Sequence, residues 1–317
     1  MFSENAIAER VTGCPHGLKK GEFWPKVLYR HIEHKKYWSP ATGKIEDLPS
    51  GWNSKRDKID LRLGYGLTDK FDVGLLFTYE WIDRKYETHQ LNCKGGKRPG
   101  SGKWCTKKDN GLTEIWISGK YKFIDKQTIG IFKNIDAAIG LGYKFDVTEK
   151  EGLKNELGNE SRGANVLRIA LLSTEELTDK VELCNHIFYD LIGERRDVSG
   201  WGKSDEEVGD IIGYKFFVEY SPFPDKKFTL VGGPIGWIQI KPNEFEEKIR
   251  VTAPGNPQYK SHIERYRHAL ALKFVYSPLR GEAGHHKKVF VGIDWDYKAK
   301  KGWKEDFVIK CGGMWTF

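Results

Sequence analysis

Apolar and polar residues alternate along two neighbouring segments of the chain. Residues 59–65 read IDLRLGY and residues 71–81 read FDVGLLFTYEW, so that apolar side chains recur at every second position. A period of two is typical of a β-strand with one apolar face. The sequence LTDK at 67–70 separates the two segments. Together they predict a β-hairpin with a short polar turn.

The same alternation recurs up to the last residue and predicts an even number of strands. Pro25 interrupts the first strand and the run GGP at 232–234 interrupts the ninth, so these two are the least regular. Strands joined in sequence as hairpins can close into an antiparallel barrel, which has no free sheet edge. The twelve predicted strands are 23–34, 59–65, 71–81, 113–123, 135–145, 167–174, 181–191, 212–220, 228–240, 265–276, 289–297 and 307–317.

The connections between the predicted strands alternate between short and long. Short turns follow strands two, six and eight, whereas the polar segments 37–55, 86–110 and 148–163 are much longer. Bacterial outer-membrane barrels have this asymmetry, with short periplasmic turns and longer extracellular loops. The predicted fold class is therefore all-β, a closed antiparallel transmembrane β-barrel of about twelve strands over 23–317. Residues 1–22 then form a periplasmic N-terminal segment, either a plug in the lumen or a tail.

The composition favours a membrane barrel over a soluble sheet protein. Aromatic residues make up 13% of the chain, although its mean hydropathy is −0.58. No segment approaches the roughly 18 apolar residues of a transmembrane helix. A transmembrane strand, by contrast, needs an apolar residue only at every second position. The apolar faces of the predicted strands end in aromatic residues, which predicts two girdles at the membrane interfaces.

Two segments carry resemblances to known proteins. The chain ends in FVIKCGGMWTF, and its terminal Phe317 with Trp315 resembles the assembly signal read by the machinery that inserts outer-membrane barrels. The hairpin 65–79, YGLTDKFDVGLLFTY, resembles a family of outer-membrane proteins described as transporters or as associated with the phenol meta-cleavage pathway. That family implies a barrel and the uptake of small, hydrophobic or aromatic molecules. The resemblance is confined to this hairpin and implies no role for single residues.

Charged residues occupy the inward positions of the predicted strands. Inside a membrane barrel such side chains must face water or pair with one another. They either line a selective constriction or form a lattice of ion pairs that closes a narrow lumen. Arg265 and Arg267 either bind an anionic solute or pair with Asp294 and Asp296 on the next strand. The candidates for solute contact are Arg62, Lys120, Lys144, Arg168, Lys215, Arg265, Arg267, Lys273, Glu80 and Glu114.

These features predict an outer-membrane channel that passes small solutes, anionic or aromatic, through a charged lumen. The alternative is a closed or plugged structural barrel whose extracellular loops bind a partner or a polymer. The net charge of +8 is spread along the chain without a zinc-finger or helix-turn-helix pattern, which argues against nucleic acid. The His-x-Asn-Gly-x-Ser pattern of outer-membrane phospholipases does not occur, and no histidine has suitably spaced metal ligands. We therefore expect no enzymatic activity, cofactor or metal.

The expected location is the bacterial outer membrane. The expected partners are outer-membrane lipid and lipopolysaccharide, the barrel assembly machinery and a small-molecule solute, with the oligomeric state left open. The first residues, MFSENAIAERVTG, lack the basic start and apolar core of a signal peptide, so this location requires a processed chain. In an oxidising compartment Cys93 and Cys105 could form a disulfide, and otherwise they are free thiols. Cys14, Cys184 and Cys311 are left unpaired by the sequence.

Overall fold

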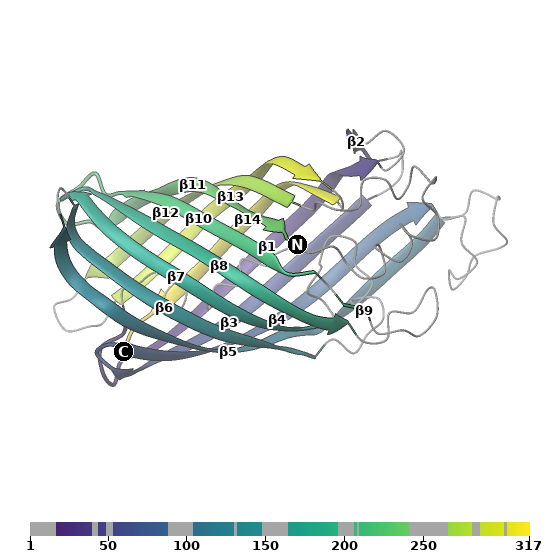
Figure 1. The fold of residues 1–317 in the computed structure, drawn as a ribbon. Coiled ribbons are helices and arrows are strands. Elements are labelled where there is room, and N and C mark those ends of the chain that lie inside the picture. The colour runs from purple at the N-terminus through teal and green to yellow at the C-terminus, as the bar shows by residue number, and fades with distance from the viewer. Residues whose placement is uncertain are drawn as a thin grey trace.

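The chain folds into a closed barrel of antiparallel strands, as a computed structural model shows (Figure 1). In the described part of the chain, no helix is long and apolar enough to cross a membrane. The structure describes residues 17–39, 44–48, 53–87, 104–129, 132–147, 164–195, 206–207, 209–240, 266–280, 286–300 and 303–317.

Twelve strands form the wall of the barrel. Two further short strands, β2 (Lys44–Asp47) and β9 (Glu206–Glu207), pair only with one wall strand each. The wall strands are β1 (Phe23–Ser39), β3 (Asn53–Thr68), β4 (Phe71–Glu87), β5 (Trp104–Ile129), β6 (Phe132–Asp146), β7 (Ala164–Thr178), β8 (Val181–Arg195), β10 (Ile211–Tyr220), β11 (Phe228–Gln239), β12 (Tyr266–Arg280), β13 (His286–Lys300) and β14 (Trp303–Trp315).

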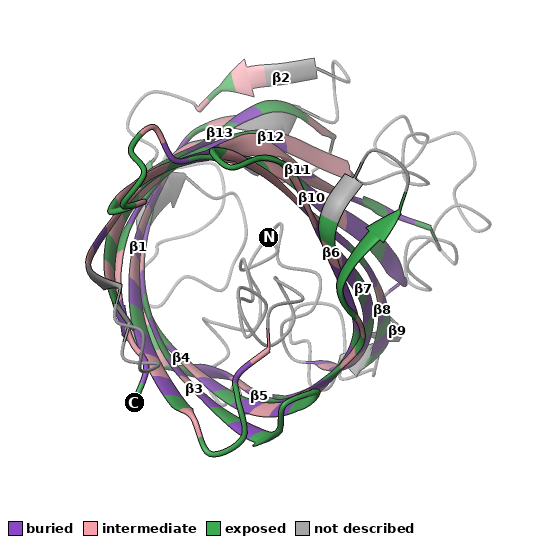
Figure 2. Ribbon diagram, turned by 90° about the vertical axis from the view of Figure 1, so that its left-hand side faces the viewer, coloured by how far each residue is buried: buried purple, intermediate pink, exposed green. Residues whose placement is uncertain are grey.

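The first and last strands close the ring. Each wall strand pairs antiparallel with its neighbours along the chain, and β1 pairs with both β3 and β14. The backbone nitrogen of Phe23 donates to the carbonyl oxygen of Phe317 at 3.0 Å, and the reverse bond measures 2.9 Å. Figure 2 shows the resulting ring of strands from one end. Because every wall strand has two partners, the barrel has no open edge, and the predicted fold class is confirmed.

The two faces of the wall differ in chemistry. Outward side chains are apolar and solvent-accessible, as for Leu61, Leu141 and Leu171, which are 41%, 55% and 54% exposed. Inward side chains are buried and many are charged, as for Lys58 and Arg62 at 0%. Buried and exposed positions alternate along the strands (Figure 2). An apolar surface that continues around a whole barrel is typical of a wall that faces lipid.

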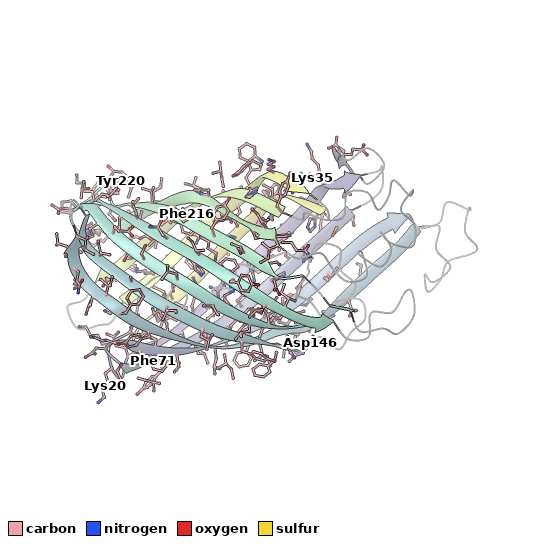
Figure 3. All side chains as sticks on the ribbon, viewed as in Figure 1. Lys20, Lys35, Phe71, Asp146, Phe216 and Tyr220 are labelled. Atoms are coloured by element: carbon pink, nitrogen blue, oxygen red, sulfur yellow. The ribbon has the colours of Figure 1, made fainter. Side chains whose placement is uncertain are left out.

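The described short turns lie at the same end of the barrel as the C-terminus. Two of them share the sequence LTDK, and in each a threonine hydroxyl accepts backbone bonds that shape the turn. Thr68 Oγ1 accepts from the nitrogens of Lys70 and Phe71, and Thr178 Oγ1 accepts equivalent bonds. Figure 3 places Phe71 and Tyr220 toward this end, and Asp146 toward the other.

The strands extend further than the alternation predicted. The second strand starts at Asn53 rather than at residue 59, and the fourth spans 26 residues, so the predicted loops 37–55 and 86–110 are partly strand. Outward positions in these extensions are polar, as at Lys55 and Asp57, so the amphipathic pattern fades although the pairing continues. The irregular strands β1 and β11 also form in spite of Pro25 and the run 232–234.

One local prediction is wrong. The alternation placed Thr113 on the outward face, but its side chain is buried at 2% exposure. A β-bulge shifts the register here, because Thr78 lies opposite Glu114 whereas Tyr79 lies opposite Leu112. The extra residue of a bulge turns a side chain to the other face. The hydroxyl of Thr113 then donates to the carbonyl oxygen of Thr78 at 3.3 Å.

Candidate functional site: the charged interior of the barrel

Inward-facing charges of both signs fill the interior. Among the residues that the structure describes, eleven buried side chains are Lys or Arg and nine are Asp or Glu. Successive side chains of a strand point to opposite faces, so the polar residues that alternate with the outward apolar ones face the interior. Burial of a charge is costly unless it is paired and hydrogen-bonded. The arrangement of these partners therefore determines what the interior can do.

Asp60 on β3 lies at the centre of the first cluster. Arg30 Nη2 on β1 donates to both carboxylate oxygens, at 2.8 and 2.9 Å. Arg62 donates to Asp60 Oδ2 at 2.7 Å and Thr78 donates to Oδ1 at 2.9 Å. A carboxylate that accepts four such bonds has its lone-pair positions occupied. This cluster ties β1, β3 and β4 together across the inner wall.

Glu80 on β4 forms a second cluster nearer the long-loop end. Its Oε1 lies 3.6 Å from Arg56 Nη1, and its Oε2 lies 3.3 Å from Lys58 Nζ. All three side chains are fully buried. Arg56 Nη2 also lies 3.4 Å from His34 Nε2. The two clusters make the inner wall of β1, β3 and β4 a lattice of ion pairs.

Arg168 on β7 is held by a carboxylate and by two aromatic rings. Its Nε and Nη2 donate to the two carboxylate oxygens of Asp190, at 2.6 and 2.7 Å. Its guanidinium carbon lies 4.1 Å from the ring centre of Phe188 and 5.1 Å from that of Trp116. The bidentate pair and the stacking fix both the position and the plane of the guanidinium.

Glycines on neighbouring strands make room for these two rings. A Cβ atom on Gly213 would lie 2.0 Å from the ring of Phe188, and one on Gly142 would lie 3.5 Å from the indole of Trp116. The aromatic rings therefore lie along the wall, over the glycine backbone. Flat rings occupy less of the barrel interior than rings that point toward the axis.

The interior of β12–β14 carries further ion pairs. Arg267 Nε donates to Asp296 Oδ1 at 2.7 Å, and Lys310 pairs with Asp294. The sequence left open whether Arg267 binds an anionic solute or pairs with an aspartate of the next strand, and in the structure it pairs with Asp296 on β13. Arg265 lies outside the described residues. Two cations also stack on inward phenylalanines, Lys26 on Phe290 at 4.8 Å and Lys273 on Phe217 at 5.1 Å.

The segment before β1 covers part of the barrel mouth at the short-turn end. The Leu18 nitrogen lies 3.1 Å from both carboxylate oxygens of Asp72, which also pairs with Lys120 at 3.2 Å. The Leu18 side chain is buried against inward-facing Trp24 and Met314. We call residues 17–22 the strap. It lies against the short-turn ends of β3 and β4 and places Leu18 inside the mouth, and residues 1–16 lie outside the described part of the chain.

Most of the candidate residues chosen from the sequence face inward. Arg267 is partly buried, with its side chain 12% exposed. The inward, buried ones are Arg62, Lys120, Lys144, Arg168, Lys215, Lys273, Glu80 and Glu114. Glu114 accepts a bond from the indole nitrogen of Trp116 at 3.3 Å. The geometry brings these residues onto one inner surface and leaves their role in solute contact a prediction.

Several inward residues were missed by the sequence analysis. Arg56 and Lys58 lie before the predicted start of their strand, where the outward positions are polar. Lys26 and Arg30 lie on the irregular first strand. His186 lies in a predicted strand but was overlooked because the search concentrated on charged residues. The parity of each strand would have found all five, since all lie an even number of positions from an inward residue.

Other sequence predictions have the following outcomes. Cys184 and Cys311 are free thiols. Cys14 and the predicted bond between Cys93 and Cys105 lie outside the side chains that the structure describes. In the described residues no group of His, Cys, Asp or Glu side chains is placed to hold a metal ion.

Comparison with known proteins identifies the fold. The structure is similar to the crystal structure of an outer-membrane channel from Pseudomonas putida F1, with a TM-score of 0.65 and 12% sequence identity, over 96% of this chain and 98% of that one. A mutant of the monoaromatic hydrocarbon channel TodX gives a TM-score of 0.44 at 9% identity, over 99% and 94% of the two chains. No protein-family model and no curated protein matches the sequence. Membership of the phenol meta-pathway family stays a prediction.

Proposed function

We propose that this protein is an outer-membrane channel that passes small solutes, preferentially anionic ones, through a narrow charged lumen. The observation that carries the proposal is the opposite chemistry of the two faces of one closed wall, apolar outside and charged inside. A closed barrel is the form in which β-strands can cross a membrane, because all their backbone groups are paired. Charged side chains inside such a wall provide a polar path across the membrane.

The preference for anions rests on the composition of the inner wall. The eleven buried basic residues exceed the nine buried acidic ones among the described residues, and the whole chain has a net charge of +8. Most of the acidic side chains pair with Lys or Arg, and the charges within each pair largely cancel, so the excess of positive charge on the inner wall is small. Fixed charges of one sign raise the local concentration of counter-ions in a narrow passage. The excess therefore supports a modest preference for anions.

The passage is expected to run along β10–β12. Among the buried Lys and Arg residues of the inner wall, Lys215 and Lys273 on these strands have the largest exposed fractions, 8% and 7%, whereas Arg56 and Arg62 on the opposite side are 1% and 0% exposed. Small inward residues, Ala269 and Ala271, leave space on the same strands. We propose that the ion-pair lattice of β1, β3 and β4 fills its side of the lumen and confines solutes to the other.

A closed or plugged barrel is the second candidate function. It is favoured by the low exposure of the inner wall and by the strap, which carries the buried Leu18 into the mouth. In this case residues 1–16 would plug the lumen, and the extracellular loops would bind a partner or a polymer. Solute flux with and without the N-terminal segment distinguishes the two candidates.

The remaining partners follow from the same proposal. The outer face would contact membrane lipid and lipopolysaccharide, and Trp315 with Phe317 would be read by the barrel assembly machinery. The outer membrane is the location that such a barrel requires. Phe317 is 59% exposed on the outer face, as recognition of its ring by another protein would need.

Solute uptake into liposomes tests the proposed function. Proteoliposomes that contain the refolded chain should swell in isotonic solutions of small carboxylate salts faster than in solutions of neutral sugars of similar size. Liposomes refolded with heat-denatured protein are the control. If flux stays at the level of the control for all solutes and rises after deletion of residues 1–16, the barrel is plugged. No flux in either form would contradict a channel.

A further inference from the structure

The inner wall of β8 and β10 carries a buried histidine whose polar atoms lack partners. His186 is 1% exposed, and among the described residues neither its Nδ1 nor its Nε2 has a hydrogen-bond partner. Buried polar atoms in folded proteins nearly always have a partner, and an exception calls for an explanation such as a bound molecule. The other buried inward histidine, His34, lies within reach of Arg56. In the described part of the chain, His186 thus differs from His34 in that neither of its two ring nitrogens is hydrogen-bonded, whereas at His34 this holds for Nδ1 alone.

Basic groups surround this imidazole. Lys215 lies directly opposite His186 on β10, and both side chains face inward. Arg168 and Lys215 are the two charged groups that act on the His186 ring electrostatically. An anion at this point of the wall would have an imidazole N–H as a hydrogen-bond donor and the ammonium of Lys215 on one side, whereas the charge of Arg168 is largely balanced by Asp190.

Aromatic rings flank the same position. The rings of His186 and Phe188 are 5.2 Å apart and tilted by 44°. Phe188 lies flat over Gly213 and carries the guanidinium of Arg168 on its face. On the Lys215 side, Phe217 packs against Ile235, with the ammonium of Lys273 5.1 Å from its ring centre. The wall therefore places an aromatic ring on each side of the imidazole along the strands.

The electrostatics of the rings favour a planar, negatively charged ligand. Arg168 already lies over the ring of Phe188 and Lys273 over the ring of Phe217, so each ring already makes a cation–π contact with a residue of the protein. A benzene ring can contact the edge of Phe188 or the partly exposed ring of Phe217 in an edge-to-face geometry. A carboxylate attached to that ring would then reach His186 and Lys215. A neutral aromatic molecule would lose the charged contacts, and an aliphatic carboxylate would lose the contact with the rings.

We propose that His186, Lys215, Phe188 and Phe217 form a binding subsite for a small aromatic carboxylate on the lumen wall. The proposal rests on the proposed channel function and names the substrate class at this site. Arg168 and Lys273 lie over the two rings and hold them in place. The carboxylate of the ligand would accept a hydrogen bond from the imidazole N–H that the described residues leave without a partner, and solute would bind there as it passes along β10–β12.

Calorimetric titration of the full chain in detergent, with benzoate as the probe, tests the subsite independently of conduction. Benzoate should bind, whereas acetate and benzyl alcohol should each bind at least about tenfold more weakly, because each lacks one of the two kinds of contact. Similar affinities for acetate and benzoate would contradict the aromatic part of the site. Similar affinities for benzyl alcohol and benzoate would contradict the anionic part. If none of the three binds, His186 has only water as a partner and the proposal is wrong.

Two substitutions locate the site. His186→Phe and Lys215→Gln should each weaken benzoate binding by about tenfold, as expected for loss of a charge-assisted hydrogen bond. Lys26→Gln is the matched control, because it removes one inward, buried cation that also stacks on a ring, on the opposite strand β1. It should leave benzoate affinity unchanged. Equal effects of Lys26→Gln and Lys215→Gln would reduce the site to the general charge of the lumen and contradict the proposal.

Folding and conduction are controlled separately. A shift between unheated and boiled samples on a gel verifies that each variant forms the barrel. His186→Gln, which keeps hydrogen-bonding atoms, should retain more benzoate affinity than His186→Phe if the imidazole contacts the carboxylate. Benzoate binding without solute flux would support the subsite and contradict the channel. Flux without any benzoate effect would support the channel and contradict the subsite.

Discussion

Single buried carboxylates hold several strands of this barrel together. Asp60 is the clearest case, because it accepts bonds from side chains on β1, β3 and β4 and is itself 0% exposed. Its two guanidinium partners, Arg30 and Arg62, are equally buried. A buried pair contributes little relative to apolar residues of the same shape, but removal of one partner leaves an uncompensated charge. The acidic residue is therefore the sensitive member of this cluster.

We predict that Asp60→Ala strongly destabilises the barrel. Two buried guanidinium groups would lose their shared acceptor, and the expected loss is about 3–5 kcal/mol. Equilibrium unfolding by urea in lipid vesicles, followed by tryptophan fluorescence, measures it. The control is Asp125→Ala, since Asp125 is half exposed in its pair with Lys122 and its removal should cost less than about 1 kcal/mol. Equal losses in the two variants would contradict the role given to Asp60.

At the scale of single elements, the strap is the segment whose position depends most on one glycine. A Cβ atom on Gly66 would lie 2.0 Å from the carbonyl oxygen of Lys19. Gly66 also exchanges backbone bonds with the strap, at 2.8 Å to Gly21 and 2.9 Å to Glu22. The strap therefore lies against β3 at a point where only glycine fits.

We predict that Gly66→Ala releases the strap from the mouth. Cleavage by trypsin after Lys19 or Lys20 should become about tenfold faster, as a loss of roughly 1.4 kcal/mol in the free energy of local opening would give. Limited proteolysis followed by mass spectrometry measures it. Gly232→Ala is the control, because its Cβ would meet nothing nearer than 3.5 Å. An unchanged cleavage rate in Gly66→Ala would mean that the strap does not depend on this contact.

The last residue, Phe317, takes part in the pairing that closes the barrel, and we propose that its ring has a separate role in assembly. Its backbone exchanges two bonds with Phe23, whereas its ring lies on the outer face. We predict that Phe317→Ala refolds in detergent like the unmodified chain but inserts poorly in cells, because only the ring is lost. Deletion of Phe317 should impair both, since the seam bonds are lost as well. Normal insertion of Phe317→Ala in cells would contradict the assembly signal.

How well each strand could be predicted depended on its position relative to the apolar band, by which we mean the part of the wall whose outward side chains are apolar. Within the band, the alternation gave the strand order, the pairing of neighbours and the inward face, because lipid contact demands an apolar residue at every second position. Above the band, both faces of β3 are polar, and the inward residues Arg56 and Lys58 lay outside the predicted strand. Thr113 was misplaced because a bulge leaves no mark in the alternation.

For the whole molecule, the alternation of apolar and polar positions predicted that the barrel closes and that its charged residues face inward. It did not predict the contacts between side chains in the interior. Parity predicts that Arg168 and Asp190 face inward, yet the stacking of Arg168 between Trp116 and Phe188 depends on room above two glycines of neighbouring strands. The width of the passage depends on such side-chain packing. The sequence alone therefore does not predict the side-chain contacts that determine what the interior can do.

At this scale the charge of the inner wall is the property on which the proposed conduction depends. Basic residues exceed acidic ones among the buried charges of the described inner wall, and the two least buried of these basic residues, Lys215 and Lys273, lie on β10 and β12. A narrow lumen with accessible cations should conduct in small, discrete steps and prefer anions. A lumen filled by ion pairs alone should not conduct.

Single-channel recording in a planar bilayer under a potassium chloride gradient tests the central claim most directly. We predict discrete current steps and a reversal potential of the sign given by a permeability for chloride greater than that for potassium. Lys215→Gln should move the reversal potential toward zero. A membrane that stays silent after insertion has been confirmed, or a reversal potential of the opposite sign, would contradict the account of an anion-preferring channel.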